Sequence, residues 1–387
     1  MTILQGLWYI MCMPLSSPTD HIDTADSRPR AWLLSAYRAD SHAAWADWLL
    51  ASQPQFNWQR LELPGRHFAW RIRGNPLSWL DALPLEQPDL IVATSMVDLA
   101  TLKGLHPRLA GVPTLYYFHE NQFAYPLSHR QNHWLEPQMV QLYGGLAADR
   151  LLFNSAFNRD SYLQGIAGLL AQMPDAVPDG VVQRLAQKSV RCPVPIEPVP
   201  AAQERDSQLV LWSHRWEHDK CPELFVEAMV ALAEEGVEFR LALLGKRPRR
   251  TPPALARLRE TLPQLIVADG QLPAAEYRGQ LGRAAIAVST ARHEFQGLAM
   301  LEAASAGAIP LVPDALCYAE QYPSVCRYPQ DDAAALVARL RLWLTGGLPP
   351  PADVTPWYSA SLAAVWAELL AAAPGAGTTP SAPSAAR

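Results

Sequence analysis

Two glutamates eight residues apart, Glu294 and Glu302, stand where a predicted strand gives way to a predicted helix. The strand covers residues 285–289, and Gly297 opens a helix over residues 297–306. Free backbone N–H groups in the first turn of a helix attract phosphates and hydroxyls, and carboxylates accept several hydrogen bonds at once. On one continuous helix the two carboxylates would lie about 12 Å apart along the axis. The pattern predicts contacts with both ends of an elongated polar ligand such as a nucleotide-sugar.

Two cations, Arg215 and Lys220, fall in the loop between a predicted strand at 209–213 and a predicted helix at 222–235. A pair of cations in such a loop can bracket a diphosphate and stabilise the charge that builds on it as a glycosidic bond breaks. The alternative is a basic loop that only faces solvent.

A histidine, His119, follows a predicted strand at 113–118 and precedes Glu120 and Asn121. Histidine titrates near neutral pH, so at the end of a strand it can bind a sugar hydroxyl or move a proton. The alternative is a structural histidine whose hydrogen bonds are satisfied within the protein.

Strand-like runs alternate with helical patterns in both halves of the chain, which predicts the α/β class. A proline-rich stretch at 191–207 separates the halves, because prolines block helices and central strands. We expect two Rossmann-like domains facing each other across a cleft, with ligands at the carboxyl ends of the strands. The predicted parts are an extension at 1–30, an N-terminal acceptor-side domain at 31–190, the linker, a donor-binding domain at 208–355, a helix at 356–373 that could pack on the first domain, and a disordered tail at 374–387.

The composition fits a globular protein and excludes several classes. Of the 387 residues, 49% are hydrophobic and 18% charged, which excludes a disordered chain. The net charge of −5 does not require a nucleic-acid partner, although a local basic patch can still bind RNA. The five cysteines include no C-x-x-C pair, so we expect reduced thiols and neither a disulfide framework nor a zinc site. No run reaches the roughly twenty apolar residues of a membrane span, and we expect a cytoplasmic protein.

Together, Arg215 and Lys220, a strand that ends at Gly245, and the E-x7-E pair resemble the donor-binding half of the retaining glycosyltransferases of the GT-B fold. The resemblance implies that Arg215 and Lys220 hold the diphosphate, Glu294 the transferred sugar and Glu302 the ribose. It also implies that no metal or other cofactor is needed. The implied donor-binding set is Arg215, Lys220, Gly245, Glu294, Phe295, Gln296, Gly297, Leu298 and Glu302, and the implied catalytic set is His119, Arg215, Lys220 and Glu294.

The segment Tyr116-Tyr117-Phe118-His119-Glu120-Asn121-Gln122 is similar to the signature of one branch, the tRNA-queuosine α-mannosyltransferases. Ser41-His42 after the first strand also fits that branch. This likeness implies transfer of mannose from GDP-mannose to queuosine in tRNA. It also places Ser41, His42, Glu120, Asn121 and Gln122 on the acceptor side. Residues 35–40 depart from the branch, which usually has an acidic residue and a Gly-Gly turn before Ser-His.

Basic residues mixed with aromatic ones are typical of contacts with RNA, since they meet phosphates and stack on bases. Arg66, Trp70, Arg71 and Arg73 form one such cluster and are expected on the acceptor side. Residues 246–250 form a second basic cluster after a strand. The alternative for both is a solvent-facing loop.

Two other functions fit the same residues. One is a related transferase with another nucleotide-sugar donor and a small-molecule or glycolipid acceptor, and the other is a non-catalytic module that binds nucleotide or RNA. Retention of configuration can arise by double displacement through an enzyme nucleophile. It can also arise by attack of the acceptor from the face that the leaving group departs, and we favour this second route. Oligomeric state does not follow from the sequence.

Overall fold

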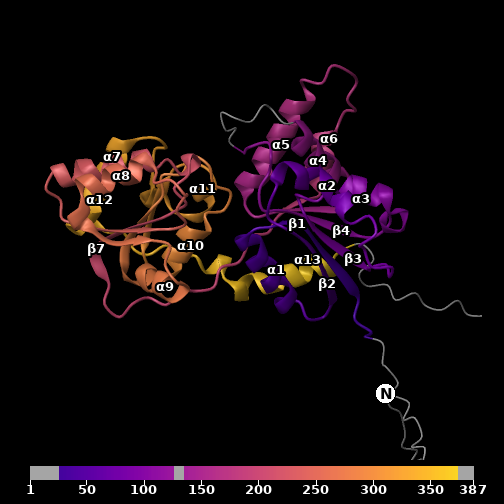
Figure 1. Cartoon of the computed structure of the whole chain (residues 1–387), viewed down its shortest axis with the longest axis horizontal. Helices are drawn as coiled ribbons and strands as arrows, with labels where there is room; N and C mark the ends of the chain where they lie inside the picture. Colours follow the sequence, from indigo (N-terminus) through magenta and orange to yellow (C-terminus); the bar gives the residue numbers. More distant parts are fainter. Residues whose placement is uncertain (1–25, 126–134, 374–387) are drawn as a thin grey trace, which may run out of the picture.

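The computed structural model describes residues 26–125 and 135–373 of the chain. It shows two lobes side by side, one from each half of the sequence (Figure 1). Most of the predicted N-terminal extension, residues 1–25, and the whole predicted tail at 374–387 lie outside the described residues.

The N-terminal lobe is built on a parallel sheet of six strands. These are β1 (Arg30–Arg38), β2 (Asn57–Pro64), β3 (Leu90–Thr94), β4 (Thr114–Phe118), β5 (Arg150–Phe153) and β6 (Ser189–Arg191). The helices are α1 (Asp40–Ser52), α2 (Phe68–Ser78), α3 (Leu99–Leu105), α4 (Leu135–Ala147), α5 (Ala156–Leu170) and α6 (Val181–Gln187). The strand order is β2-β1-β3-β4-β5-β6. Every residue of β3 and β4 is buried, as expected for central strands with both faces covered.

The C-terminal lobe repeats this plan. Its strands are β7 (Asp206–Ser213), β8 (Arg240–Leu244), β9 (Ile266–Gly270), β10 (Ala284–Val288), β11 (Ile309–Pro313) and β12 (Arg327–Tyr328). Its helices are α7 (Pro222–Glu234), α8 (Pro253–Thr261), α9 (Ala274–Arg283), α10 (Leu298–Ser305), α11 (Tyr318–Gln321) and α12 (Ala333–Leu342). The order β12-β11-β10-β7-β8-β9 is that of a dinucleotide-binding sheet.

The strand order reverses once in each sheet, and neighbouring loops part there to leave a crevice. The reversal lies between β1 and β3 in the first sheet and between β7 and β10 in the second. Arg215 and Lys220 follow β7, Glu294 follows β10, and Ser41 and His42 follow β1. The sheets therefore present predicted site residues at their reversal points.

The linker between β6 and β7 is packed rather than loose. Ile196 N donates to Trp357 O at 2.9 Å, and Ser359 N donates to Ile196 O at 3.0 Å. These bonds join the linker to the segment that leads into the last helix. The backbone thus passes between the lobes twice, once in the linker and once in the segment before the last helix, and hydrogen bonds join these two segments.

The last helix, α13 (Ser359–Ala371), lies against the N-terminal lobe beside α1 (Figure 1). Trp366 is fully buried, with its ring 5.4 Å from that of Tyr117 and 5.7 Å from that of Trp45. Gln53 also donates to Ala363 O at 2.9 Å. This packing ties the end of the described chain to the first sheet.

Candidate active site

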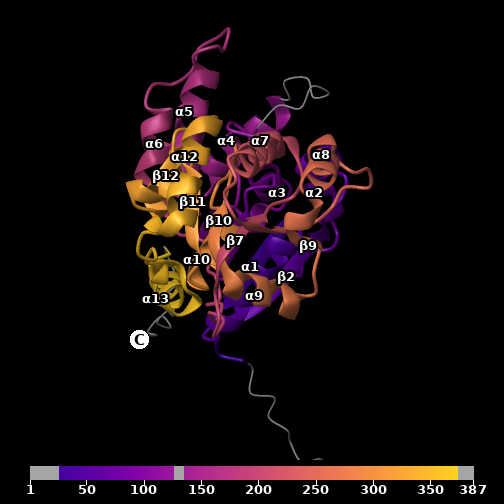
Figure 2. The ribbon, with the colours of Figure 1, turned by 90° about the vertical axis from the view of Figure 1, so that its left-hand side faces the viewer.

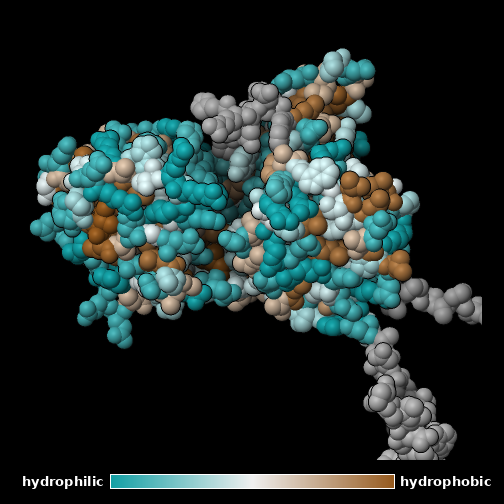
Figure 3. All heavy atoms as spheres, viewed as in Figure 1, coloured by the Kyte–Doolittle hydropathy of each residue, from teal (hydrophilic) through white to brown (hydrophobic). Residues whose placement is uncertain are grey.

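A cleft between the lobes consists of two adjoining cavities, of about 1140 Å³ and about 180 Å³. Both are lined by His42 and Glu120 from the N-terminal lobe and by Arg215, Lys220 and Glu294 from the C-terminal lobe. The hollow is visible between the two lobes in Figure 3. Candidates that are far apart in the sequence therefore meet in one place.

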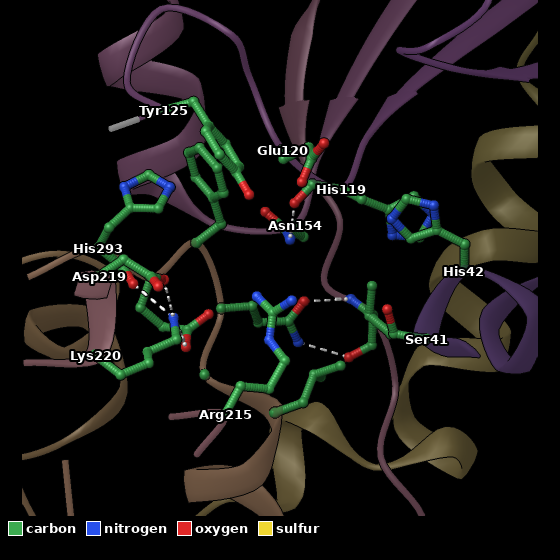
Figure 4. Close-up of a pocket in the computed structure, with 16 residues that line it drawn as sticks. Ser41, His42, His119, Glu120, Tyr125, Asn154, Arg215, Asp219, Lys220 and His293 are labelled. Atoms are coloured by element: carbon green, nitrogen blue, oxygen red, sulfur yellow. Dashed lines mark hydrogen bonds and ion pairs between the residues drawn. The ribbon is translucent and has the colours of Figure 1, made fainter. Parts of the chain in front are cut away.

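A buried ion pair between Lys220 and Glu294 forms one wall of the cleft. Nζ of Lys220 lies 3.1 Å from Oε2 of Glu294 and 3.1 Å from Oδ2 of Asp219, and it donates to His293 O at 2.7 Å (Figure 4). Burial opposes charge on Lys220, but the two carboxylates outweigh it and raise the pKa of the amine. Burial also opposes charge on Glu294, yet Lys220 and His214 lower the pKa of that carboxyl to about 2. Both groups are charged at neutral pH.

The loop after β7 carries a second cation, Arg215, whose side chain is 54% exposed. It points into the pocket and lines both cavities (Figure 4). Its nearest carboxylate within the described part of the chain is Glu217, at 3.4 Å. The three ammonium hydrogens of Lys220 already have acceptors, so Arg215 is the more available of the two for an anionic ligand.

His119 faces these cations from the end of β4. Its ring stacks on that of His42 with centroids 4.1 Å apart, and the rings of Trp45 and Tyr117 meet it edge-on. Burial, with a smaller contribution from His42, lowers the pKa of His119 well below 6.5. Its Nε2 has no hydrogen-bond partner among residues 26–125 and 135–373. A neutral ring at the cavity wall can bond to a hydroxyl of a ligand without bringing a charge.

Glu302 lies on α10 and does not itself line either cavity. Its Oε2 accepts from the hydroxyl of Tyr277 at 3.0 Å, and that hydroxyl lies 3.2 Å from Oγ of Ser213, which lines the larger cavity. Burial raises the pKa of Glu302, although the bond from Tyr277 works in the other direction. The carboxylate is therefore positioned near the cleft by Tyr277.

The helix start predicted at Gly297 is confirmed, so the two glutamates do not share one continuous helix. α10 begins at Leu298, after Gly297, whose φ of 67° lies in the left-handed region. Glu294 therefore precedes the helix, and the 12 Å spacing along one axis does not apply. A Cβ on Gly297 would come within 2.8 Å of Cε1 of Tyr318, so both the backbone angle and the space require glycine.

Of two further residues expected on the donor side, Gly245 lines neither cavity, and Gln296 lines the smaller one but has its carboxamide bonded to the linker. Gly245 has a φ of 97°, and a Cβ there would lie 2.4 Å from His214 O, so it allows two loops to pass closely. The carboxamide of Gln296 accepts from Val194 N at 2.8 Å and donates to Val194 O at 2.6 Å. Gln296 therefore fastens the donor-side loop to the linker.

The other two donor-side candidates are Phe295 and Leu298. Phe295 is buried and packs between His293 and Phe157, with ring centroids 4.5 and 6.0 Å away. Leu298 lines both cavities. Because Phe157 belongs to the N-terminal lobe, Phe295 also contributes a contact between the lobes.

On the acceptor side, the cleft includes Ser41, His42, Glu120 and Gln122 but not Asn121. Asn121 is fully buried. Its amide donates to Asn158 O, Asn158 Oδ1 and Ser161 Oγ, and its carbonyl accepts from two backbone N–H groups that follow it. Asn121 was expected to contact a ligand. In the structure its side chain is used instead within the protein, where it shapes the loop after His119.

The basic cluster on the first lobe lies outside both cavities. Arg66 precedes α2, and Trp70, Arg71 and Arg73 lie on it; Arg73 pairs with Asp98. The neighbouring Gly65 and Phe68 do line the larger cavity. The cluster therefore stands at the edge of the cleft. The segment at 35–40 that departs from the family branch is closer: it forms the end of β1 and the start of α1, and its residues 37–40 line that cavity.

Several side chains of the pocket were not predicted from the sequence. They are Tyr125, Asn154, Ser213, Asp219 and His293, together with Tyr277, which lines neither cavity but bonds to Glu302. Asn154 Nδ2 donates to His119 O at 2.8 Å, and His293 supplies the carbonyl that Lys220 binds. Asn154 and Asp219 follow strands and Ser213 is the last residue of one, a signal that could have found them. Tyr125 and Tyr277 carry no such signal.

Nothing in the described ranges points to a metal centre. No group of three or more His, Cys, Asp or Glu side chains is placed to hold an ion within residues 26–125 and 135–373. Over the same residues, no helix combines the length and the hydropathy needed to cross a bilayer. The four described cysteines, Cys192, Cys221, Cys317 and Cys326, are buried and free.

Two parallel α/β lobes, with cations and carboxylates at the reversal point of the second sheet, define a glycosyltransferase of the GT-B fold. Solved structures share this architecture. Sucrose-phosphate synthase from Thermosynechococcus elongatus superposes with a TM-score of 0.62 at 14% identity, over 88% of this chain and 98% of that one. HepE of Anabaena in complex with UDP-glucose gives a TM-score of 0.58 at 10% identity, over 88% and 99%.

Sequence comparison narrows the class. Residues 30–196 match the family model of the tRNA-queuosine alpha-mannosyltransferase N-terminal region. The tRNA-queuosine alpha-mannosyltransferase of Drosophila melanogaster is 31% identical over 321 residues, which cover 79% of this chain and 85% of the relative. The chain belongs to the tRNA-queuosine alpha-mannosyltransferase family.

Proposed function

We propose that the enzyme transfers mannose from GDP-mannose to queuosine in tRNA, with retention of the α configuration. The observation that carries the proposal is the pairing of the cleft's two walls: Arg215, Lys220 and Glu294 on one side face His119 and Glu120 on the other. The name of the Drosophila relative supports both the sugar and the acceptor. The proposed acceptor places the reaction in the cytoplasm.

In this proposal the nucleotide-sugar lies along the second sheet. The guanidinium of Arg215 binds the diphosphate, and Lys220 adds positive charge from the buried pair. The ionised carboxylate of Glu294 accepts hydrogen bonds from mannose hydroxyls, because its low pKa keeps it an acceptor. Glu302, held by Tyr277, is the acceptor for the ribose hydroxyls. No metal or other cofactor is required, since the cations neutralise the leaving group.

Transfer then proceeds on the face from which GDP departs. The queuosine hydroxyl attacks the anomeric carbon as its bond to the phosphate oxygen breaks, and the departing phosphate takes the proton. His119, neutral because it is buried, binds a mannose hydroxyl and orients the sugar. A covalent route would instead use one of the carboxylates that line the smaller cavity, Glu120, Asp219 or Glu294. A glycosyl ester trapped on any of them would contradict the proposal.

The test offers purified enzyme a panel of nucleotide-sugars together with bulk tRNA from cells with and without queuosine. We expect a mass gain of one hexose on tRNA that requires both GDP-mannose and queuosine. A gain with another donor would correct the donor. Nucleotide release onto a different acceptor, without any gain on tRNA, would overturn the proposed function.

A further inference from the structure

The loop after β8, residues 246–250, forms a positively charged edge on the C-terminal side of the cleft, the first of two basic lips. Lys246 lines the larger cavity, and Arg249 and Arg250 are exposed beside it. Arg247 turns inward instead, where it binds Asp269 at 2.5 Å and lies 5.1 Å from the ring of Trp216. No Asp or Glu occurs between residues 239 and 259. The outward positive charge of this loop is thus not balanced from within its own segment.

A second basic lip lies on the N-terminal side, where α2 begins. Arg66 and His67 are exposed there, and the flanking Gly65 and Phe68 line the same cavity as Lys246. No Asp or Glu occurs between residues 63 and 80. In the view along the line that joins the lobes, α8 stands in front of α2 (Figure 2). The two lips therefore lie on the same side of the molecule, across the cleft from each other.

One large aromatic side chain, Trp70, stands next to the second lip and is 54% exposed. Its indole lies across Gly74: a Cβ at that position would come within 2.4 Å of Cε2 and 2.7 Å of Cζ2. The ring is held on one side by the helix backbone and is open on the other. A fixed, open indole beside cations is suited to stacking on an unpaired base.

We infer that these two lips and Trp70 form the RNA-docking surface of the enzyme. The lips, residues 65–68 and 246–250, contact phosphates on both sides of the cleft mouth, and Trp70 stacks on one unpaired base of the loop that carries the acceptor nucleoside. The inference rests on the proposed function, which gives the enzyme an RNA acceptor. It adds where the RNA lies and explains how a chain with a net charge of −5 can bind a polyanion.

The test measures binding of a fluorescein-labelled, unmodified anticodon stem-loop RNA by anisotropy at several salt concentrations. The variant Arg249→Glu/Arg250→Glu should bind at least about tenfold more weakly, and its salt slope should fall by about 1.4, or about 0.7 for each lost phosphate contact. The control Arg184→Glu/Arg283→Glu changes net charge equally on exposed residues of α6 and α9 and should match wild type.

The aromatic part is tested separately. Trp70→Ala should weaken RNA binding about 5- to 100-fold, whereas Trp70→Phe should remain within about threefold, with melting temperature as the check on folding. RNA binding by the arginine variant equal to that of its control would overturn the inference. The inference would also be overturned if the wild-type enzyme bound phosphatidylglycerol vesicles but not RNA. Self-association of the enzyme that Trp70→Ala abolishes would overturn it too, because Trp70 would then serve a contact between protein molecules. RNA binding that depends on these residues, without sugar transfer to queuosine, would overturn only the proposed function.

Discussion

Replacing Lys220 with methionine should destabilise the C-terminal lobe, because it leaves a buried carboxylate without its main partner. The partners of Glu294 lower its pKa from 4.5 to about 2 even though burial acts in the opposite direction. At about 1.36 kcal/mol for each pH unit by which the pKa falls, this lowering corresponds to about 3 kcal/mol of stability of the folded protein. Removing one partner of a buried pair typically costs about 3–5 kcal/mol. We expect Lys220→Met to lower the free energy of unfolding by about 3 kcal/mol at pH 7.

The pH dependence gives this prediction a second, independent readout. In the wild type, the pKa of Glu294 is lower in the folded protein than in the unfolded chain. Its contribution to the free energy of unfolding is therefore complete above about pH 4.5 and is lost as the pH falls toward 2. In Lys220→Met, burial remains and raises the folded pKa above the unfolded one. The penalty should therefore shrink between pH 7 and pH 5, as the buried carboxyl takes up a proton.

The assay is urea unfolding followed by circular dichroism at pH 7 and pH 5, with Lys246→Met as the matched control. Lys246 lines the same cleft but is exposed, so its loss should cost less than about 0.5 kcal/mol. A Lys220→Met variant within about 1 kcal/mol of wild type, which is about the cost of an average point substitution, would contradict this expectation. A deficit that does not change between the two pH values would refute the electrostatic part.

Three further predictions concern the cleft. Gly245→Ala should lower stability by at least about 1–2 kcal/mol, seen as a lower melting temperature, because the residue is left-handed and its Cβ would meet His214 O; an unchanged melting temperature would contradict this. Tyr277→Phe should weaken GDP binding about fivefold by calorimetry, because Glu302 loses its positioning bond; unaltered affinity would remove Glu302 from the nucleotide site. His119→Ala should reduce kcat/KM about 100- to 1000-fold; because burial holds the pKa of His119 well below 6.5, its protonation should cause no loss of wild-type activity between pH 8 and pH 6.

The sequence predicted the two-lobed architecture because parallel strands, buried on both faces, leave short apolar runs that can be recognised. It also placed Arg215, Lys220 and Glu294 in strand-to-helix loops of one domain, at the carboxyl ends of its strands. His119 was expected to face them, because the strands of both domains were predicted to end at the cleft between them. Strand ends are thus the feature from which most of this pocket could be predicted.

Side-chain direction within the loops could not be predicted in this way. Asn121 and Gln122 are neighbours, yet Asn121 points into the lobe to shape its own loop while Gln122 lines the cleft. Gln296 was expected to meet the donor, but its carboxamide binds the backbone of Val194 in the linker, 102 positions away in the sequence. The start of the helix at Gly297 was predicted, but the left-handed backbone of that residue, with a φ of 67°, was not.

Transfer with retention from GDP-mannose to queuosine in tRNA can be tested on the product itself. After incubation of queuosine-containing tRNA with enzyme and GDP-mannose, the tRNA is digested to nucleosides and the modified queuosine is examined by mass spectrometry and NMR. We expect one added hexose, identified as mannose and α-linked to a hydroxyl of the queuosine side group. Unmodified queuosine, or a β-linked sugar, would contradict it.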